Sequence, residues 1–241
     1  MRAIILAGGK GRRLLPYTTV IPKPLMPVGG RPIVEVIITQ LKSNGFSRVT
    51  MAVGYLAELI EAYFGDGDRY GIEVDYSREN KPLGTIGSLS LIEGLDDTFI
   101  VMNGDVLTNL DYTRLLDFHE KNHGMATIAT CDRQVNIDLG ILELDGGLQL
   151  KQYIEKPTFT HHVSMGIYVF EPEILEFIEP NQYLDFPDLV VALLKAGRRV
   201  MAYPFDGYWL DIGRHEDYAQ ALEEFETMEE FNSLKEKLNI E

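Results

Sequence analysis

The chain has 241 residues, of which 45% are hydrophobic and 24% charged, and its formal net charge is -15. This composition predicts a folded globular protein with a large core, and the acidity argues against a nucleic-acid binder held by a broad basic surface. No stretch approaches the ~20 apolar residues of a membrane span, so we expect no membrane partner. The single cysteine, Cys131, cannot form an internal disulfide, which fits a cytoplasmic location.

The first half of the chain predicts strands and helices in alternation. Short apolar runs bounded by turn residues indicate strands, and apolar residues at helical spacing indicate helices. The expected strands are 3–6, 48–53, 72–76 and 99–102, and the expected helices are 32–41, 57–64 and 84–92. This βαβαβ order with short connections predicts an α/β, Rossmann-like fold with a mostly parallel central sheet flanked by helices.

The second half is richer in strands. The expected strands are 126–130, 140–144, 150–154, 163–170 and 200–203, and the expected helices are 112–119 and 186–195. From His215 the pattern is helical to near the C-terminus. We therefore expect a single domain over residues 1–241, in which residues 111–214 form a strand-rich lobe built on the same sheet and residues 215–241 form a helical C-terminus.

A segment rich in glycine, cations and proline follows the first strand, and it reads LAGGKGRRLLPYTTVIPKPLMPV over residues 6–28. Glycines let backbone N–H groups approach phosphate oxygens, and the prolines around Lys23 fix the path of that lysine. The loop fits neither known spacing, because a dinucleotide fold needs a glycine where Leu14 stands and a P-loop spacing is absent. A plain turn between strand and helix is one interpretation. The basic residues after the loop favour a phosphate site, with Arg13 and Lys23 as its cations.

Six ordered motifs give this sequence a specific resemblance. They are LAGGKGRRLLPYT…PKPLMPVGGRPI from Leu6, PLGTIG from Pro82, NGD from Asn103, EKP from Glu155, SMGIY from Ser164 and WLDIG from Trp209. Together they resemble the sugar-1-phosphate nucleotidyltransferases over nearly the whole catalytic domain, and the wording is nearest to the mannose-1-phosphate guanylyltransferase branch.

The resemblance implies a set of site residues. The catalytic residues would be Arg13, Lys23, Asp105, Lys156 and Asp211, with Asp105 and Asp211 holding Mg²⁺. The NTP would be bound by Leu6, Ala7, Gly8, Gly9, Gly11, Arg13, Lys23, Pro82, Gly84, Thr85, Asn103 and Gly104. The sugar phosphate would be bound by Gly140, Glu155, Lys156, Ser164, Gly166 and Tyr208. Residues 1–110 would form the nucleotide-binding lobe and residues 111–214 the sugar-phosphate lobe.

The implied reaction is attack of a sugar 1-phosphate on the α-phosphorus of an NTP, which releases pyrophosphate. GTP with mannose 1-phosphate or a related sugar 1-phosphate is our first expectation, and CTP or dTTP with glucose 1-phosphate is the alternative. Gly87 stands near the position where thymidylyltransferases of this family carry a glutamine, which argues against dTTP. A non-catalytic nucleotide-sugar-binding regulatory protein would also fit the fold, although the charges needed for turnover are present. A homo-oligomer is one open outcome.

Overall fold

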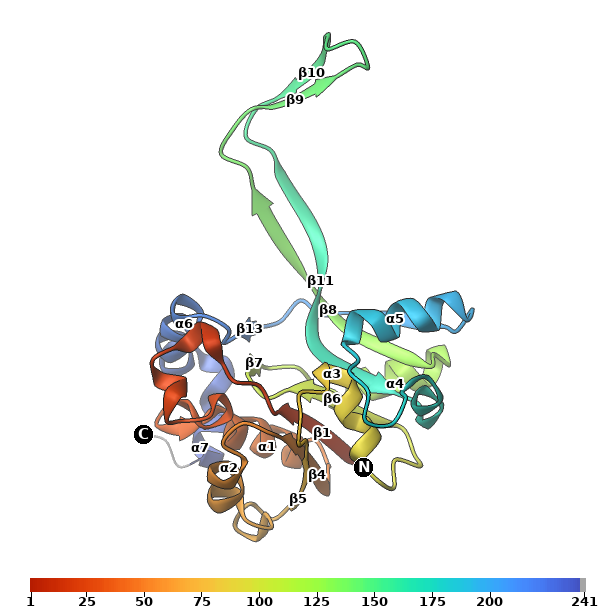
Figure 1. Cartoon of the computed structure of the whole chain (residues 1–241). Helices are drawn as coiled ribbons and strands as arrows, with labels where there is room; N and C mark the ends of the chain where they lie inside the picture. Colours follow the sequence, from red (N-terminus) through yellow and green to blue (C-terminus); the bar gives the residue numbers. More distant parts are fainter. Residues whose placement is uncertain (239–241) are drawn as a thin grey trace.

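The computed structural model describes residues 1–238 and is built around one large β-sheet (Figure 1). This sheet has seven strands in the order β12-β8-β11-β6-β1-β4-β5. Every neighbouring pair is parallel except the two pairs that β11 makes with β6 and β8. The predicted α/β fold, with a mostly parallel central sheet flanked by helices, is confirmed.

The strands agree closely with the predicted ranges, except that β8 and β11 extend well beyond them. The main sheet comprises β1 Arg2–Ala7, β4 Arg48–Val53, β5 Glu73–Arg78, β6 Phe99–Asn103, β8 Ala126–Asn136, β11 Thr158–Phe170 and β12 Val200–Pro204. The short strands are β2 Pro27–Val28, β3 Arg31–Pro32, β7 Val106–Thr108, β9 Ile141–Leu144, β10 Leu150–Ile154 and β13 Trp209–Asp211. The helices are α1 Ile33–Ser43, α2 Ala57–Phe64, α3 Gly84–Gly87, α4 Tyr112–Asn122, α5 Phe186–Lys195, α6 His215–Thr227 and α7 Asn232–Leu238.

The sheet is buried on both faces, which explains why its central strands are apolar throughout. Successive side chains of a strand point to opposite faces. In β6, Ile100 and Met102 belong to the core under α1, α2, α4, α6 and α7, whereas Phe99 and Val101 belong to the core under α3 and α5. Both faces therefore need apolar side chains, and an alternating pattern would have been wrong for these strands.

The predicted helix over residues 84–92 is wrong in its length. Helix α3 ends at Gly87, and residues 88–91 continue as a 3₁₀ turn. The reason lies in the contacts of its backbone, because the amides of Ile86 and Gly87 both donate to the carbonyl of Leu184 at 3.0 Å. The segment is thus held as a tight turn against the chain before α5.

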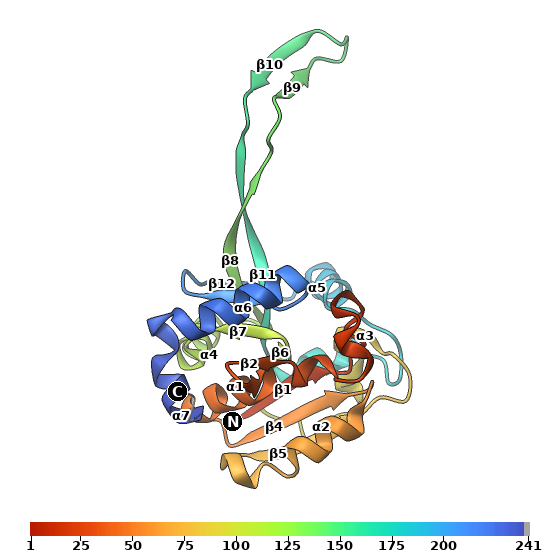
Figure 2. The same ribbon diagram turned by 90° about the vertical axis from the view of Figure 1, so that its left-hand side faces the viewer.

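A long two-stranded arm is the most distinctive feature of the fold (Figures 1 and 2). Strands β8 and β11 continue past the edge of the sheet, and β9 and β10 form a separate hairpin at the far end. We call residues 131–163 the arm. The division of the chain with a strand-rich lobe over residues 111–214 stays a prediction. The structure adds that two strands of the main sheet, β8 and β11, run on into the arm. Alternation in a sequence predicts such strands but not what covers them.

The C-terminal segment is helical in its described part. Helices α6 and α7 pack on the main core through residues such as Phe225 and Leu234. Residues 239–241 of the predicted segment 215–241 lie outside the described residues. Within residues 1–238, no helix combines the length and the apolar character that crossing a bilayer requires.

Replacing Gly84 with alanine is expected to lower the free energy of unfolding by about 2 kcal/mol. Gly84 has φ 78°, and an added Cβ would lie 2.6 Å from the carbonyl oxygen of Leu184. Urea unfolding followed by circular dichroism measures the change. Gly146→Ala is the control, since a Cβ there would meet no atom within 4 Å. Equal stability of both variants would contradict the role given to this turn.

Candidate active site

A cavity opens at the carboxyl edge of the central sheet, where β6 ends and the arm begins. Its volume is about 430 Å³. In open α/β sheets this edge is where ligands bind. The cavity is lined by Thr85, Asn103, Ser164, Met165, Gly166, Tyr168, Asp185, Phe186, Pro187, Trp209 and Asp211. Five of the predicted site residues are thereby brought to one place: Thr85, Asn103, Ser164, Gly166 and Asp211.

Asp105 and Asp211 are brought together by two short strands. Strand β7 begins just after Asp105 and β13 ends at Asp211, and the two pair so that Asp211 lies opposite Val106. The amide of Ile212 donates to the carbonyl of Asp105 at 3.0 Å, which fixes this register. Burial raises the pKa of the Asp211 carboxyl, and the neighbouring Asp105 raises it further, while Lys23 and Arg13 oppose the shift. The two carboxylates are therefore close enough for the charge of Asp105 to act on Asp211.

Lys23 is the cation in direct contact with this pair. Its ammonium group contacts Oδ2 of Asp105, and the two side chains are only 14% and 17% exposed. Pro22 and Pro24 on either side of it are buried. The prolines hold the backbone here, as the sequence predicts, and the lysine has little freedom to leave the carboxylate.

Arg13 is a second cation that acts on Asp211. A Cβ added at Gly213 would lie 3.2 Å from a guanidinium nitrogen of Arg13 and 3.2 Å from Oδ2 of Asp211. Arg13 is exposed, in contrast to Lys23. Gly213 is therefore a site residue that the sequence reasoning did not select, because any side chain at this position would crowd the contact between cation and carboxylate.

The glycine loop lies after β1 and is held by a few specific contacts. Gly11 has φ 59°, and the buried hydroxyl of Thr18 donates to its carbonyl at 2.9 Å. An added Cβ would clash with Thr18 at 2.8 Å, so this position requires glycine. Gly9 has open space around its Cβ position and faces solvent. Its exposed backbone can accept a ligand, as the phosphate interpretation requires.

Glu79 is an acidic neighbour of the loop that the sequence did not indicate. A Cβ at Gly8 would lie 2.6 Å from Oε1 of Glu79. The other carboxylate oxygen, Oε2, accepts a hydrogen bond from the amide of Leu83 at 3.1 Å. Glu79 thus ties the glycine loop to the segment that precedes Gly84.

Asn103 and Gly166 lie in contact at the floor of the cavity. Gly166 has φ 73°, and a Cβ there would lie 2.6 Å from the amide nitrogen of Asn103. The amide of Gly104 donates to the carbonyl of Leu6 at 3.0 Å, which joins this floor to the start of the glycine loop. The side of the cavity is formed by Phe186, whose ring stacks on Tyr168 at 3.8 Å between centroids. These two aromatic residues were missed by the sequence reasoning.

Tyr208 is not among the residues that line the cavity, so the structure adds no support for its predicted place in the sugar site. Its hydroxyl donates to Glu224 of α6 at 2.7 Å, and its ring packs edge-on against Phe231. The neighbouring Trp209 lines the cavity instead, with its indole N–H donating to the carbonyl of Met165 at 2.9 Å. Adjacent residues of a strand face opposite sides, so Trp209 shares the face of Asp211 and Tyr208 cannot.

Three further predicted residues are separated from the cavity, because Gly140, Glu155 and Lys156 all lie on the arm. Thr158 is six residues from Ser164 along β11, which is about 20 Å at the rise of a β-strand, and Lys156 lies beyond it. The ring of Tyr153 fills the space beside Gly140, and its hydroxyl donates to Glu155 at 2.6 Å. Within one described chain, the structure does not bring these residues to Asp105 and Asp211.

The pair of aspartates is the candidate site for a metal. Among the side chains that the structure describes, no group of three or more His, Cys, Asp or Glu is placed to hold a metal ion. The pair itself has a free ligand atom, because Oδ1 of Asp105 is buried and has no hydrogen-bond partner in the described chain. Two carboxylates with an unused oxygen suit a hard divalent cation that takes its remaining ligands from phosphate and water.

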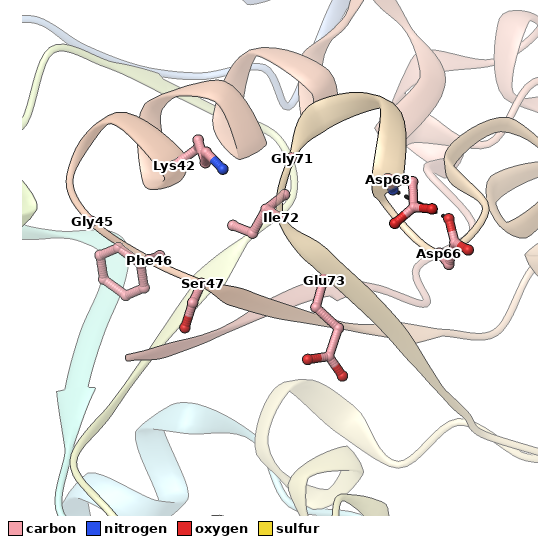
Figure 3. A pocket seen from close by; sticks show the side chains of 9 residues that line it. All are labelled: Lys42, Gly45, Phe46, Ser47, Asp66, Asp68, Gly71, Ile72 and Glu73. Atoms are coloured by element: carbon pink, nitrogen blue, oxygen red, sulfur yellow. Dashed lines mark hydrogen bonds between the residues drawn. The ribbon is translucent and has the colours of Figure 1, made fainter.

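A larger cavity of about 540 Å³ lies at the opposite edge of the sheet (Figure 3). It is formed where α1 ends and where β4 and β5 begin, and Lys42 and Glu73 are among its lining residues. This is the amino edge of the parallel strands, away from the edge where ligands bind in such sheets. None of the predicted site residues line it, so we do not assign it to the reaction.

Comparison with known proteins places the chain among nucleotidyl transferases. The family model described as Nucleotidyl transferase matches residues 2–228. A UTP–glucose-1-phosphate uridylyltransferase from Synechocystis is 36% identical over 92% of this chain, and a mannose-1-phosphate guanylyltransferase from Mycobacterium tuberculosis is 32% identical over 90% of it. The chain spans 62% of the length of each of these relatives.

A solved structure is similar to this chain in fold. The crystal structure of HddC from Yersinia pseudotuberculosis complexed with GMP-PN has a TM-score of 0.71 and 28% identity, and the match covers 93% of this chain and 99% of that one. The match of the family model over nearly the whole chain, with the motifs that carry the resemblance, decides the assignment: the chain belongs to the nucleotidyl transferase family.

Proposed function

We propose that this chain transfers a nucleotidyl group from an NTP to a sugar 1-phosphate, giving an NDP-sugar and pyrophosphate. The observation that carries the proposal is the cluster of Asp105, Asp211, Lys23 and Arg13 beside the glycine loop at the carboxyl edge of the sheet. In this reaction a phosphate oxygen of the sugar attacks the α-phosphorus of the NTP, and the bond from that phosphorus to the bridging oxygen of pyrophosphate breaks.

The attacking phosphate is already an anion near pH 7, so the chain needs no general base. Its task is to hold two polyanions together and to offset the charge that develops on the phosphates. Lys23 is held rigidly for this purpose, and the exposed Arg13 can contact phosphates that reach the glycine loop. The open backbone at Gly9 accommodates a phosphate without steric conflict.

Mg²⁺ is the cofactor that we propose for the aspartate pair. The unused buried oxygen of Asp105 and the adjacent Asp211 fit this ion. When bound, Mg²⁺ would supply positive charge to the phosphate oxygens. Asp105 and Asp211 orient one another through the β7–β13 register, so that both carboxylates are in place before substrates arrive.

The residues around the cavity come from two parts of the chain, and we propose that each part binds a different substrate. We propose that residues 1–110 bind the NTP through the glycine loop, Pro82–Thr85 and Asn103–Gly104, and that residues 111–214 bind the sugar phosphate. Ser164 and Gly166 line the cavity where these parts meet. Both substrates are phosphorylated metabolites, which fits a cytoplasmic location.

GTP with mannose 1-phosphate or a related sugar 1-phosphate is our first assignment. The support is the name of the mycobacterial relative and the GMP-PN complex of HddC. The cyanobacterial relative is named for UTP and glucose 1-phosphate, so UTP joins CTP and dTTP as an alternative nucleotide. A regulatory protein that only binds a nucleotide sugar is the alternative from another functional class, and the complete charged cluster speaks against it.

A matrix of five NTPs against several sugar 1-phosphates tests the proposal. The five are ATP, GTP, CTP, UTP and dTTP, and pyrophosphate release with Mg²⁺ is the measurement. We expect one preferred pair, with GTP among the nucleotides used. Release with another base would correct the assignment of the base, and no release in any combination would favour the regulatory protein.

A further inference from the structure

The two faces of the stem of the arm differ in polarity. Cross-strand partners lie on the same face of a strand pair. Phe159 lies opposite Val135 and Val163 lies opposite Cys131 on one face, and the pair of His161 with Arg133 lies between them on that face. The other face carries only polar pairs: Thr158 with Asn136, Thr160 with Gln134 and His162 with Asp132. The large hydrophobic side chains of the paired stem are thus confined to one face.

The hairpin at the far end repeats this division. Leu142 lies opposite Tyr153, and Leu144 lies opposite Leu150, which gathers four large hydrophobic side chains on one face. All four are between 49% and 57% exposed. Leu148, in the turn between the two strands, is 83% exposed. No part of the described chain covers these side chains, because the arm stands clear of the body (Figures 1 and 2).

The exposed surface of the arm is large enough for a stable interface. Eight large hydrophobic side chains of the arm are exposed: Val135, Leu139, Leu142, Leu144, Leu148, Leu150, Tyr153 and Phe159. At roughly 100 Å² each they present on the order of 800 Å², which is what one partner contributes to an interface of standard size. A free two-stranded hairpin is marginal in water, so a partner that covers the arm would also stabilise it.

A second copy of this chain is the partner that fits the geometry. The arm begins at the cavity, since Ser164 lines the cavity and directly follows Val163. Two arms placed side by side and antiparallel about a two-fold axis can bring the middle of each arm, where Lys156 lies between β10 and β11, to the base of the other. Such a contact is closed and self-complementary, which stops it from propagating into a filament.

One cation of the arm is of a kind that the lining of the cavity lacks. The residues that line the cavity include Asp185 and Asp211 and, in the described chain, no lysine or arginine. Lys156, on the arm, is exposed and makes no ion pair with any described residue. Its φ is 44°, although it precedes Pro157 and is not a glycine. Such strained positions cluster at functional sites.

We propose that two copies of the chain form a dimer by exchanging arms, and that Lys156 of each copy completes the sugar-phosphate site of the other. The ligand of this lysine is the phosphate of the sugar 1-phosphate, and that part of the inference rests on the proposed function. The arm exchange itself rests on the uncovered apolar faces and the length of the arm. It explains why Lys156 and Asp105 are far apart within one chain.

Complementation between two inactive variants tests the proposal. Asp105→Asn and Lys156→Ala chains carry different affinity tags, are produced together and are purified as the mixed dimer through both tags. In the exchanged dimer one site has Asp105 from one chain and Lys156 from the other, so we expect about half of the wild-type activity. Each variant alone is expected to fall below about one hundredth of wild type.

The possible results separate the arm exchange from the proposed function. A mixed dimer no more active than its parents shows that Lys156 does not act between chains and overturns the proposal. A full-length wild-type protein that is monomeric by sedimentation also overturns it. Wild type that is dimeric but inactive with every substrate pair refutes the proposed function and with it the role of Lys156. In that case the dissociation constants of the Phe159→Asp and Thr160→Asp dimers decide whether the arms are exchanged.

Two adjacent residues of β11 provide the matched measurement of assembly. Phe159→Asp places a charge on the apolar face, and Thr160→Asp places the same charge on the polar face. We expect the first to weaken the dimer by roughly 30-fold or more and the second to leave its dissociation constant unchanged. Equal effects in sedimentation would overturn the assignment of the apolar face to the interface. Circular dichroism confirms that both variants are folded.

Discussion

Replacing Asp105 with asparagine is expected to lower kcat for pyrophosphate release by about 10³-fold while the chain remains folded. The substitution keeps the size of the side chain and removes its charge. Oδ1 of Asp105 is the buried oxygen without a partner, and Oδ2 contacts Lys23. The variant therefore loses one of the two carboxylates available to a divalent cation. This decrease in kcat corresponds to the loss of several kcal/mol of stabilisation of the phosphates in the transition state.

The effect on stability should be small because two contributions oppose each other. Asparagine loses the ion pair with Lys23, and it also ends the repulsion between Asp105 and Asp211 that raises the pKa of Asp211. Urea unfolding measures the balance. A second measurement, independent of turnover, is the shift of the melting temperature with added Mg²⁺, which we expect in wild type and not in the variant.

Asp111→Asn is the matched control for this prediction. Asp111 caps the N-terminus of α4, where its carboxylate accepts hydrogen bonds from the amides of Thr113 at 2.9 Å and Arg114 at 3.3 Å. Asparagine caps a helix about as well as aspartate, so activity and stability should stay near wild type. If Asp105→Asn retained kcat within tenfold of this control, the assignment of a metal to Asp105 would be wrong.

The parts of the fold that depend on neighbouring residues could be predicted from the sequence. Strand β4 and helices α2 and α5 have the predicted limits, because their apolar spacing and flanking turn residues act locally. The glycine loop and the prolines around Lys23 belong to the same class. Their conformations are set within a few residues, and the prediction of a phosphate site there rests on residue type.

The pairing of Asp105 with Asp211 could not be derived from local sequence. It depends on strands β7 and β13, which have three residues each and are separated by about a hundred residues of chain. Strands this short have no readable periodicity. The two aspartates were identified through the resemblance to a family, and the register between the two strands supplies the physical reason.

Tyr208 and the arm show two different limits of sequence reasoning. For Tyr208 the necessary signal was present, since a strand alternates and Asp211 must then share its face with Trp209. For the arm it was absent, since the pattern of β8 and β11 predicts that one face is covered but does not say by what. A strand has the same residue pattern whether its apolar face is covered by its own chain or by another chain.

Replacing Lys23 with alanine is expected to lower kcat/KM for the NTP by about 10²-fold or more, with a smaller rise in KM for the sugar 1-phosphate. Lys23 lies beside the glycine loop, since its Cβ is 3.4 Å from the Cβ position of Gly11, and its ammonium contacts Asp105. This position supports the proposal that Lys23 contacts the nucleotide. Steady-state kinetics with each substrate varied in turn separates the two effects.

The same substitution should lower stability, because it leaves Asp105 without a cation beside Asp211. Breaking a mostly buried ion pair by removing one partner costs more than removing both. A double-mutant cycle of Lys23→Ala with Asp105→Asn is expected to give a coupling of about 1–3 kcal/mol in urea unfolding. Lys42→Ala, at the opposite edge of the sheet, is the matched control. It should leave the kinetics unchanged and show no coupling with Asp105→Asn. Equal losses in the apparent affinities for both substrates would reject the assignment of Lys23 to the NTP, and zero coupling would reject its pairing with Asp105.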